Sequence, residues 1–260
     1  TPPWSWTAVG DLIRLRNQSG TWLLMLPSLW SLILANGGRP PWSLMVVFAM
    51  GAFVMRSLGV VFNDLADRNF DKHVARTSGT PLADGRLAPR QALLIALFLA
   101  AVYPFSKRWI QIPQAMLGIA FGWGAVMAWS ASRDQIDQPA WWLFGATICW
   151  AIAYDTIYAL QDREDDRRIG VKSSALLFGE AVPAAVGCFL SGMVVCLMAA
   201  GWLSGLRMEY YLTLALIAGL FLSQVRRLRT PITPQAAFVM FHQHVYAGIA
   251  VLLGIWIGTL

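Results

Sequence analysis

Three observations predict an all-α polytopic membrane protein. Apolar stretches long enough to cross a bilayer as helices, about 17–25 residues, recur along the whole chain. The chain is 57% hydrophobic and 13% charged, with a mean hydropathy of +0.54, whereas a soluble domain is closer to half apolar and a quarter charged. The apolar runs are continuous rather than alternating, which favours helices over a membrane β-barrel.

Eight spans are predicted, and tryptophan and tyrosine crowd the ends of several, as in an interfacial belt. No polar stretch is long enough for a separate soluble domain, so we expect one membrane domain over residues 1–260. We expect the natural chain to begin before Thr1, and no signal peptide is evident. The spans are 20–36, 41–63, 89–105, 113–131, 140–160, 182–204, 208–225 and 235–258.

The net charge of +6 comes from short basic loops, which indicate membrane orientation rather than nucleic-acid binding. Arg14 and Arg16 place the N-terminus in the cytoplasm, and the basic stretch 64–88 agrees with that side. The later basic stretches 162–181 and 226–229 also look cytoplasmic, yet simple counting of spans puts them outside.

One extra crossing between residues 85 and 106 removes this conflict. The run 89–105 is too short to cross twice, because one crossing takes about 20 residues. We infer that about one helix is absent from this chain, or that this segment is irregular.

Several other features are predicted to be structural. Cys149, Cys188 and Cys196 lie in apolar runs and are expected to be buried packing residues without a metal or a disulfide. His242 and His244 point to different sides of a helix, so a metal pair is not expected. The glycines of LGIAFGWG (117–124) favour close helix packing rather than phosphate binding.

The stretch NDLADRNFD (63–71) places three carboxylates directly after an apolar run. Asp64, Asp67 and Asp71 are spaced by three and four residues, which puts them on one face of a helix. Like charges on one face repel unless a positive group holds them. A cation is therefore expected at this helix end.

A second stretch, YDTIYALQDREDD (154–166), repeats the pattern. Tyr154, Tyr158, Asp162 and Asp166 follow one another at steps of four. That spacing predicts one stripe along a single helix that runs out of the membrane. Basic residues follow the aspartates here, as they do after the first motif.

Two acidic stripes with basic neighbours predict a site for Mg²⁺ and a lipid diphosphate. Hard oxygen ligands suit Mg²⁺, which binds through a few carboxylates plus substrate phosphates. Nearby arginine and lysine suit the other phosphate oxygens, and the lipid tail would run between helices. The alternative is that these acids are solvated helix ends, which is the favoured interpretation for Glu164 and Asp165.

These motifs resemble those of the UbiA prenyltransferases, whose patterns are NDxxDxxxD and YxxxYxxxDxxxD. The likeness covers nearly the whole chain and is closest to the branch that prenylates 4-hydroxybenzoate. It rests on MRSLGVVFNDLADRNFDKHVART, YPFSKRW, LGIAFGWG, AYDTIYALQDREDDRRIGVKSSALLFG and FHQHVYAG. The family implies nine helices around a central apolar cavity.

The chain departs from the family pattern in two places. The family usually has Arg-Pro-Leu where this chain has Thr80-Pro81-Leu82, which removes a phosphate-binding arginine. The family also usually has another apolar helix before the stretch YPF at 103–105. That helix is the crossing that the charge pattern independently requires.

The resemblance implies Mg²⁺-dependent transfer of a polyprenyl group from polyprenyl diphosphate to the carbon ortho to the hydroxyl of 4-hydroxybenzoate. The step would serve ubiquinone or plastoquinone biosynthesis, in a bacterial inner or plasma membrane or its equivalent, with the active site facing the cytoplasm. Other acceptors within the family are homogentisate, dihydroxynaphthoate, chlorophyllide and haem. Outside enzymes, the alternative is a cation transporter, whose acids would lie at mid-membrane. Neither prenyl chain length nor protein partners follow from the sequence.

The resemblance also implies roles for individual residues. Arg56, in an apolar segment seven residues before Asn63, would bind the benzoate carboxylate; its alternative is a snorkelling or packing arginine. For the tyrosines, core packing is the alternative. Expected metal ligands are Asp64, Asp67, Asp71, Asp162 and Asp166; expected catalytic residues are Asp67, Asp71, Asp162 and Asn63; expected substrate-binding residues are Arg56, Asn63, Arg68, Arg76, Tyr154, Tyr158 and Lys172.

Overall fold

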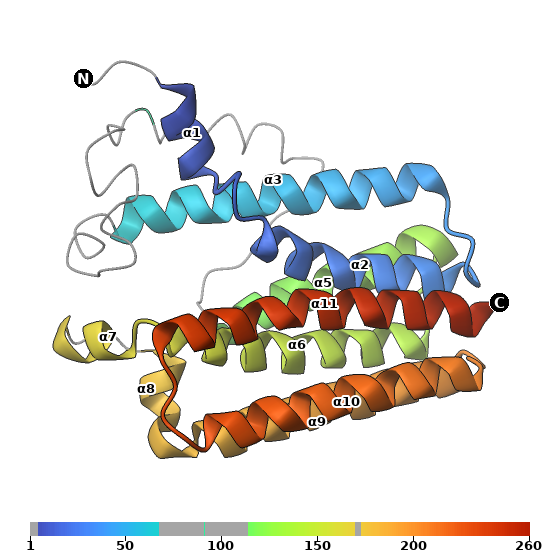
Figure 1. Ribbon diagram of the computed structural model, residues 1–260. Coiled ribbons are helices and arrows are strands. Elements are labelled where there is room, and N and C mark those ends of the chain that lie inside the picture. The colour runs from blue at the N-terminus through green and yellow to red at the C-terminus, as the bar shows by residue number, and fades with distance from the viewer. Residues whose placement is uncertain (1–4, 68–90, 92–113, 170–172) are drawn as a thin grey trace.

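The computed structural model describes residues 5–67, 91, 114–169 and 173–260, without the side chains of 66, 67, 114–117 and 169. Within those residues the regular structure is entirely helical, and the long helices run side by side (Figure 1). The long helices are α2 (Ser19–Ala35), α3 (Trp42–Asp67), α5 (Gln114–Arg133), α6 (Gln138–Ala159), α9 (Val182–Leu203), α10 (Met208–Leu228) and α11 (Pro234–Thr259). The short ones are α1 (Trp6–Leu12), α7 (Arg163–Ile169), α8 (Ser174–Phe178) and the 3₁₀ turn Gly179–Ala181.

Seven of the eight predicted spans are helices in the structure, and the eighth, 89–105, lies outside the described residues. Four segments of the described chain are long and apolar enough to cross a membrane, and the shorter α2 is also apolar. The four segments are Trp42–Leu65, Ser174–Leu203, Met208–Leu228 and Pro234–Thr259. The fold is therefore that of an all-α polytopic membrane protein.

Large aromatic side chains and glycines pack the middle of the bundle. Trp30 of α2 and Trp150 of α6 lie with ring centroids 5.0 Å apart, and both are fully buried. The Trp30 indole N–H donates to the Gly248 carbonyl of α11 at 2.9 Å. A side chain at Gly248 would collide with Trp150 and Leu26, so glycine is required for this close approach.

The packing of α5 confirms that LGIAFGWG is a helix-packing segment. A β-carbon on Gly118 would lie 3.2 Å from the Ile148 backbone, and one on Gly122 would lie 3.1 Å from the Phe144 carbonyl oxygen. The cysteine prediction was partly wrong. The three thiols are free, but only Cys149 and Cys196 are half-buried, whereas Cys188 is exposed because it lies on an outer face of α9.

Helix directions bring the two acidic motifs to one end of the bundle. Helices α2 and α5 are parallel, while α3 is antiparallel to α2 and α6 is antiparallel to α5 (Figure 1). The contacts that fix these directions are Ser31 with Ala125 and Asn36 with Ser132 between α2 and α5, and Gly118 with Ile148 and Gly122 with Phe144 between α5 and α6. Consequently α3 and α6 end on the same side, and we call this side the acidic end. This is the arrangement that the charge pattern required.

Candidate active site

The first motif begins with a buried, ion-paired aspartate. Asp64, near the end of α3, is 5% exposed. Nη2 of Arg14 donates to both of its carboxylate oxygens, at 3.1 and 3.2 Å. Arg14 lies in the turn after α1 with φ +55°, in the left-handed region. Arg14 therefore holds the Asp64 carboxylate in an ion pair.

Much of the first motif lies outside the described residues. Asn63 is exposed at the end of α3, next to Asp64. Asp67 is the last residue of α3, but its side chain is not described. The predicted site residues outside the described residues are Arg68, Asp71, Arg76 and Lys172.

The second motif is not one continuous helix, and the predicted single stripe was wrong. Helix α6 ends at Ala159, and α7 begins at Arg163 after a short turn. Asp162 immediately precedes α7, where aspartate is favoured as an N-cap, and acids fill the first turn of α7. Its carbonyl accepts from the Asp166 N–H at 2.8 Å. The chain therefore starts a new helix where it reaches water, and Asp162 and Asp166 are both half-buried there.

The basic stretch 162–181, which was predicted as a loop, contains two short helices, α7 and α8. Within it, Glu164 is exposed and pairs only at the surface, with Arg167 at 3.4 Å. The interpretation of Glu164 as a solvated residue is therefore confirmed.

Arg56 lies deeper in α3, at the level of the tyrosines of α6. Its side chain is half-buried, and its electrostatic neighbours are Tyr158, Arg14, Tyr154 and Asp64. The guanidinium lies directly against Gly20 at the start of α2, where any larger residue would collide with it. The absence of a side chain at position 20 therefore allows Arg56 to extend across α2 toward α6.

The two tyrosines face an aromatic cluster on α11. Tyr158 and Phe241 have ring centroids 4.7 Å apart, and Tyr154 lies 6.0 Å from both Phe241 and His244. The His244 ring accepts a hydrogen bond from Trp150. Sequence reasoning missed Arg14 and His244 as neighbours of the site, because their partners lie far away in the chain.

The donor set at the acidic end suits a hard cation. Among the described residues, no three His, Cys, Asp or Glu side chains converge on one point. Asp64 and Asp162 nevertheless come from two different helices to the same end, and Asp67 and Asp71 follow Asp64 in the sequence. Carboxylate oxygens are the ligands that Mg²⁺ prefers, and Mg²⁺ needs only one or two of them alongside phosphates and water.

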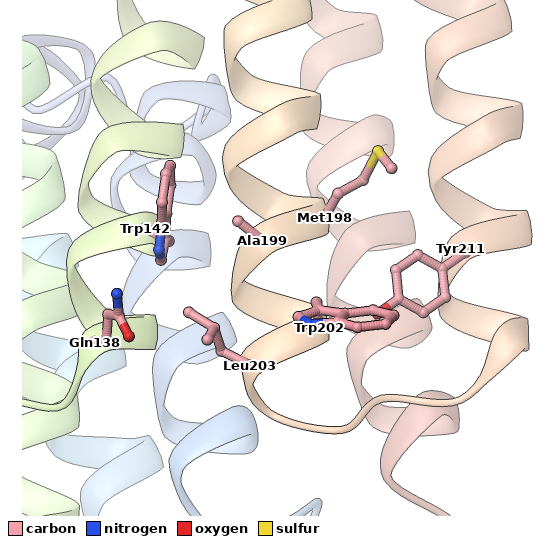
Figure 2. A pocket seen from close by; sticks show the side chains of 7 residues that line it. All are labelled: Gln138, Trp142, Met198, Ala199, Trp202, Leu203 and Tyr211. Carbon is pink, nitrogen blue, oxygen red and sulfur yellow. The ribbon is translucent and has the colours of Figure 1, made fainter.

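A hollow of about 400 Å³ lies at the other end of the bundle, which we call the opposite end (Figure 2). It lies between the start of α6, the end of α9 and the start of α10, and its walls are mostly apolar. The lining residues are Gln138, Trp142, Met198, Ala199, Trp202, Leu203 and Tyr211. It holds no acid or base, so it is not the candidate active site, and its tryptophans match the predicted interfacial belt.

A sequence model of the UbiA prenyltransferase family matches residues 24–102 and 93–246. The chain belongs to this family. The 4-hydroxybenzoate octaprenyltransferase of Pectobacterium carotovorum subsp. carotovorum (strain PC1) is 40% identical, over 97% of this chain and 96% of that protein. The enzyme of the same name from Aeromonas salmonicida (strain A449) is 42% identical, over 94% of this chain and 93% of that protein.

Solved structures agree on the fold. A digeranylgeranylglyceryl phosphate synthase superposes with a TM-score of 0.69 at 15% identity, covering 97% of this chain and 98% of that one. A UbiA homolog from Archaeoglobus fulgidus, bound to GPP and Mg²⁺, gives a TM-score of 0.63 at 18% identity, covering 95% and 99%. This UbiA-type chain is therefore an integral membrane prenyltransferase, in a family with a metal-bound member.

The comparisons also show a difference in length between this UbiA chain and a relative. The alignment with the Pectobacterium enzyme is 279 positions long, although this chain has 260 residues, so the relative has positions without a counterpart here. The two family matches overlap at residues 93–102. The alignment covers 97% of this chain, about 252 residues, which leaves about 27 of its 279 positions without a counterpart here. That number is enough for one membrane-spanning helix of about 20 residues, and it supports the inference that about one crossing is missing from this chain.

Proposed function

We propose that this chain transfers a polyprenyl group from a polyprenyl diphosphate to the ring carbon ortho to the hydroxyl of 4-hydroxybenzoate. The observation that carries the proposal is the meeting of two acidic motifs at one end of an apolar bundle, within reach of an intramembrane arginine. Relatives about 40% identical over almost their whole length carry the name of this activity. The product would enter ubiquinone biosynthesis, or the corresponding plastoquinone pathway.

The acidic end would bind the diphosphate. Asp64, Asp67, Asp71, Asp162 and Asp166 are the proposed ligands of Mg²⁺, which when bound would neutralise the negative charge that develops on the leaving group. In the basic stretches that follow the two motifs, Arg68, Arg76 and Lys172 would donate to the phosphate oxygens. Thr80 cannot supply the charge of the family's arginine, so these three residues carry more of that task.

The aromatic acceptor would lie between α3 and the tyrosines of α6. Arg56 would bind its carboxylate, and Asn63 would hydrogen-bond the substrate or the water around the metal. The π faces of Tyr154 and Tyr158 would stabilise the cationic end of the prenyl chain after the allylic C–O bond breaks. The ring carbon then forms the new C–C bond, and its proton passes to a base, for which the released diphosphate is available. Apolar walls exclude the water that would otherwise trap the cation.

The acidic end would face the cytoplasm, because the basic residues of the loops gather there. A cation transporter is the competing function. It would need carboxylates along a path through the membrane, whereas Asp64 and Asp162 lie at helix ends and have arginines close by.

The test is transfer of radiolabelled 4-hydroxybenzoate into the lipid phase. The full-length protein in membranes receives the labelled acid, a long-chain polyprenyl diphosphate and Mg²⁺. We expect label to move into lipid with the wild type, and to stay in water with EDTA, with Asp67→Asn and with Arg56→Ala. The matched control is Asp134→Asn, at the opposite end, where φ is +55° and asparagine is well tolerated; this variant should keep wild-type turnover.

Other results would point elsewhere. Label that moves with homogentisate but not with 4-hydroxybenzoate would keep the family reaction and replace the acceptor. If no aromatic acceptor is prenylated by folded protein, the proposed function is wrong, and cation flux through proteoliposomes becomes the next measurement.

A further inference from the structure

Two buried polar atoms beside the proposed acceptor site have no hydrogen-bond partner among the residues that the structure describes. They are the hydroxyl of Tyr154, on α6, and Nε2 of His244, on α11. The two side chains are 3% and 0% exposed, and their ring centroids lie 6.0 Å apart. Buried polar groups are almost always hydrogen-bonded, so two unpaired ones on adjacent rings need an explanation.

The surroundings of His244 determine what its free nitrogen offers. The Trp150 indole N–H donates to Nδ1 of His244 at 2.9 Å. An indole can only donate, so Nδ1 is the acceptor, and the proton of the neutral imidazole is on Nε2. Phe221 stacks on the same ring, with centroids 5.4 Å apart and planes 23° from parallel. His244 therefore offers a hydrogen-bond donor whose direction is fixed by two neighbours.

The ligand that suits these atoms is an anion. The phenol of Tyr154 can donate as well, and Arg56 is close enough to interact electrostatically with it. Two neutral donors and a guanidinium match the lone pairs of a carboxylate, which only accepts.

We infer that Tyr154 and His244 complete, with Arg56, the subsite for the carboxylate of the aromatic acceptor. The inference rests on the proposed function and extends it, because it makes His244 a specificity-determining residue and Trp150 its positioning residue. In the present structure both unpaired atoms are covered by their neighbours. Phe241 packs on Tyr154 and on Tyr158, and an acceptor can reach the two atoms only if neighbouring side chains move.

Tyr210 provides a matched control for the Tyr154 hydroxyl. It is equally buried but lies at the opposite end, and its hydroxyl donates to the Leu197 carbonyl at 2.8 Å. Removing a paired hydroxyl leaves a buried carbonyl without its donor, which lowers stability. Removing an unpaired hydroxyl does not leave such a group. Tyr210→Phe should therefore lower the stability of the protein, whereas Tyr154→Phe should not.

The experiment measures the melting temperature, the KM for each substrate and the direct binding of 4-hydroxybenzoate by calorimetry. It uses full-length protein in nanodiscs with the variants Tyr154→Phe, His244→Leu, His244→Gln and Tyr210→Phe. We expect Tyr154→Phe and His244→Leu to raise the KM for 4-hydroxybenzoate about tenfold, and to leave that for polyprenyl diphosphate within about twofold, since each removes a hydrogen bond to a charged group. His244→Gln, which keeps an N–H near the Nε2 position, should restore part of the affinity. Tyr210→Phe should lower only the melting temperature.

The neutral analogue 4-hydroxybenzamide distinguishes carboxylate recognition from a general packing effect. The wild type should prefer the acid over the amide, and Tyr154→Phe should lose about tenfold of that preference. The inference is overturned if Tyr154→Phe and His244→Leu leave acceptor KM and binding unchanged; the two atoms would then bind an internal water. If the wild type binds 4-hydroxybenzoate and loses that binding in both variants but prenylates nothing, the subsite stands and the proposed function fails. Absence of binding to the wild type overturns both.

Discussion

At the opposite end of the bundle, the polar side chains of Asp137 and Tyr210 are hydrogen-bonded or ion-paired. Asp137, which precedes α6, accepts from the Trp129 indole at 3.0 Å and pairs with Arg133 at 3.6 Å. The Tyr210 hydroxyl bonds to the Leu197 carbonyl. The hollow there is lined by apolar side chains and Gln138 alone among polar ones (Figure 2). This end has the properties of a structural cap against the lipid headgroups.

The half of the bundle toward the acidic end differs. Of the seven buried side-chain atoms without a partner in the described part of the chain, only the Ser204 hydroxyl lies at the opposite end. The other six belong to Tyr154, Arg163, Ser173, Ser174, Gln224 and His244. Arg163, Ser173 and Ser174 lie close to residues 170–172, which are outside the described part of the chain, so the contrast rests on Tyr154, Gln224 and His244. Natural proteins leave polar groups unsatisfied mainly where function requires it, so these three atoms indicate where a ligand binds.

The largest expected effect comes from neutralising one carboxylate at each end of the bundle and comparing the results. Asp162→Asn at the acidic end should lower kcat by about a hundredfold or more, because it removes a carboxylate that would hold the Mg²⁺ on the leaving diphosphate, and it should leave the melting temperature almost unchanged. Asp137→Asn at the opposite end should do the reverse, with a stability loss of about 1 kcal/mol from weaker hydrogen bonding and normal turnover. Thermal unfolding and steady-state kinetics on both variants measure this. Equal loss of activity in the two would remove the functional difference between the ends.

A smaller effect is expected from Gly20→Ala. The added methyl group would displace the Arg56 guanidinium, so the KM for 4-hydroxybenzoate should rise about tenfold, equivalent to about 1.4 kcal/mol of lost interaction with a charged group. The control is Gly59→Ala on α3, which has no neighbour within 4 Å and should gain up to about 1 kcal/mol of helix stability without a change in KM. An unchanged KM in Gly20→Ala, measured with saturating polyprenyl diphosphate, would mean that Arg56 does not contact the acceptor.

Local sequence signals predicted the helices well. The apolar runs 182–204 and 235–258 became α9 and α11 with ends within two residues, because membrane helices bury their backbone polar groups within one segment. The break between α6 and α7 was missed, because a spacing of four continues across a turn as easily as along a helix. Its signal was present in Asp162, a favoured N-cap ahead of an acidic first turn.

The sequence predicted which residues belong to the candidate site, but not which of them contact one another. Both aspartate motifs and Arg56 stood out, since charges at or inside apolar spans are costly. The contacts Arg14–Asp64 and Trp150–His244 join residues 50 and 94 positions apart. They depend on how α2, α3, α6 and α11 pack against one another, which the spacing of residues along the sequence does not reveal. The roles of all the proposed site residues stay predictions, and Asp71, Arg68, Arg76 and Lys172 also lie outside the described part of the chain.

The central claim is that the two motifs form one diphosphate site, and Mn²⁺ binding tests it most directly. Mn²⁺ replaces Mg²⁺ because electron paramagnetic resonance counts the free ion. Protein in nanodiscs is titrated with and without geranyl diphosphate for the wild type, Asp64→Asn, Asp162→Asn and Asp137→Asn. We predict that diphosphate-dependent Mn²⁺ binding weakens about tenfold or more in each of the first two variants and is unchanged in Asp137→Asn. Wild-type Mn²⁺ binding in either Asp64→Asn or Asp162→Asn would contradict a single site shared by both motifs.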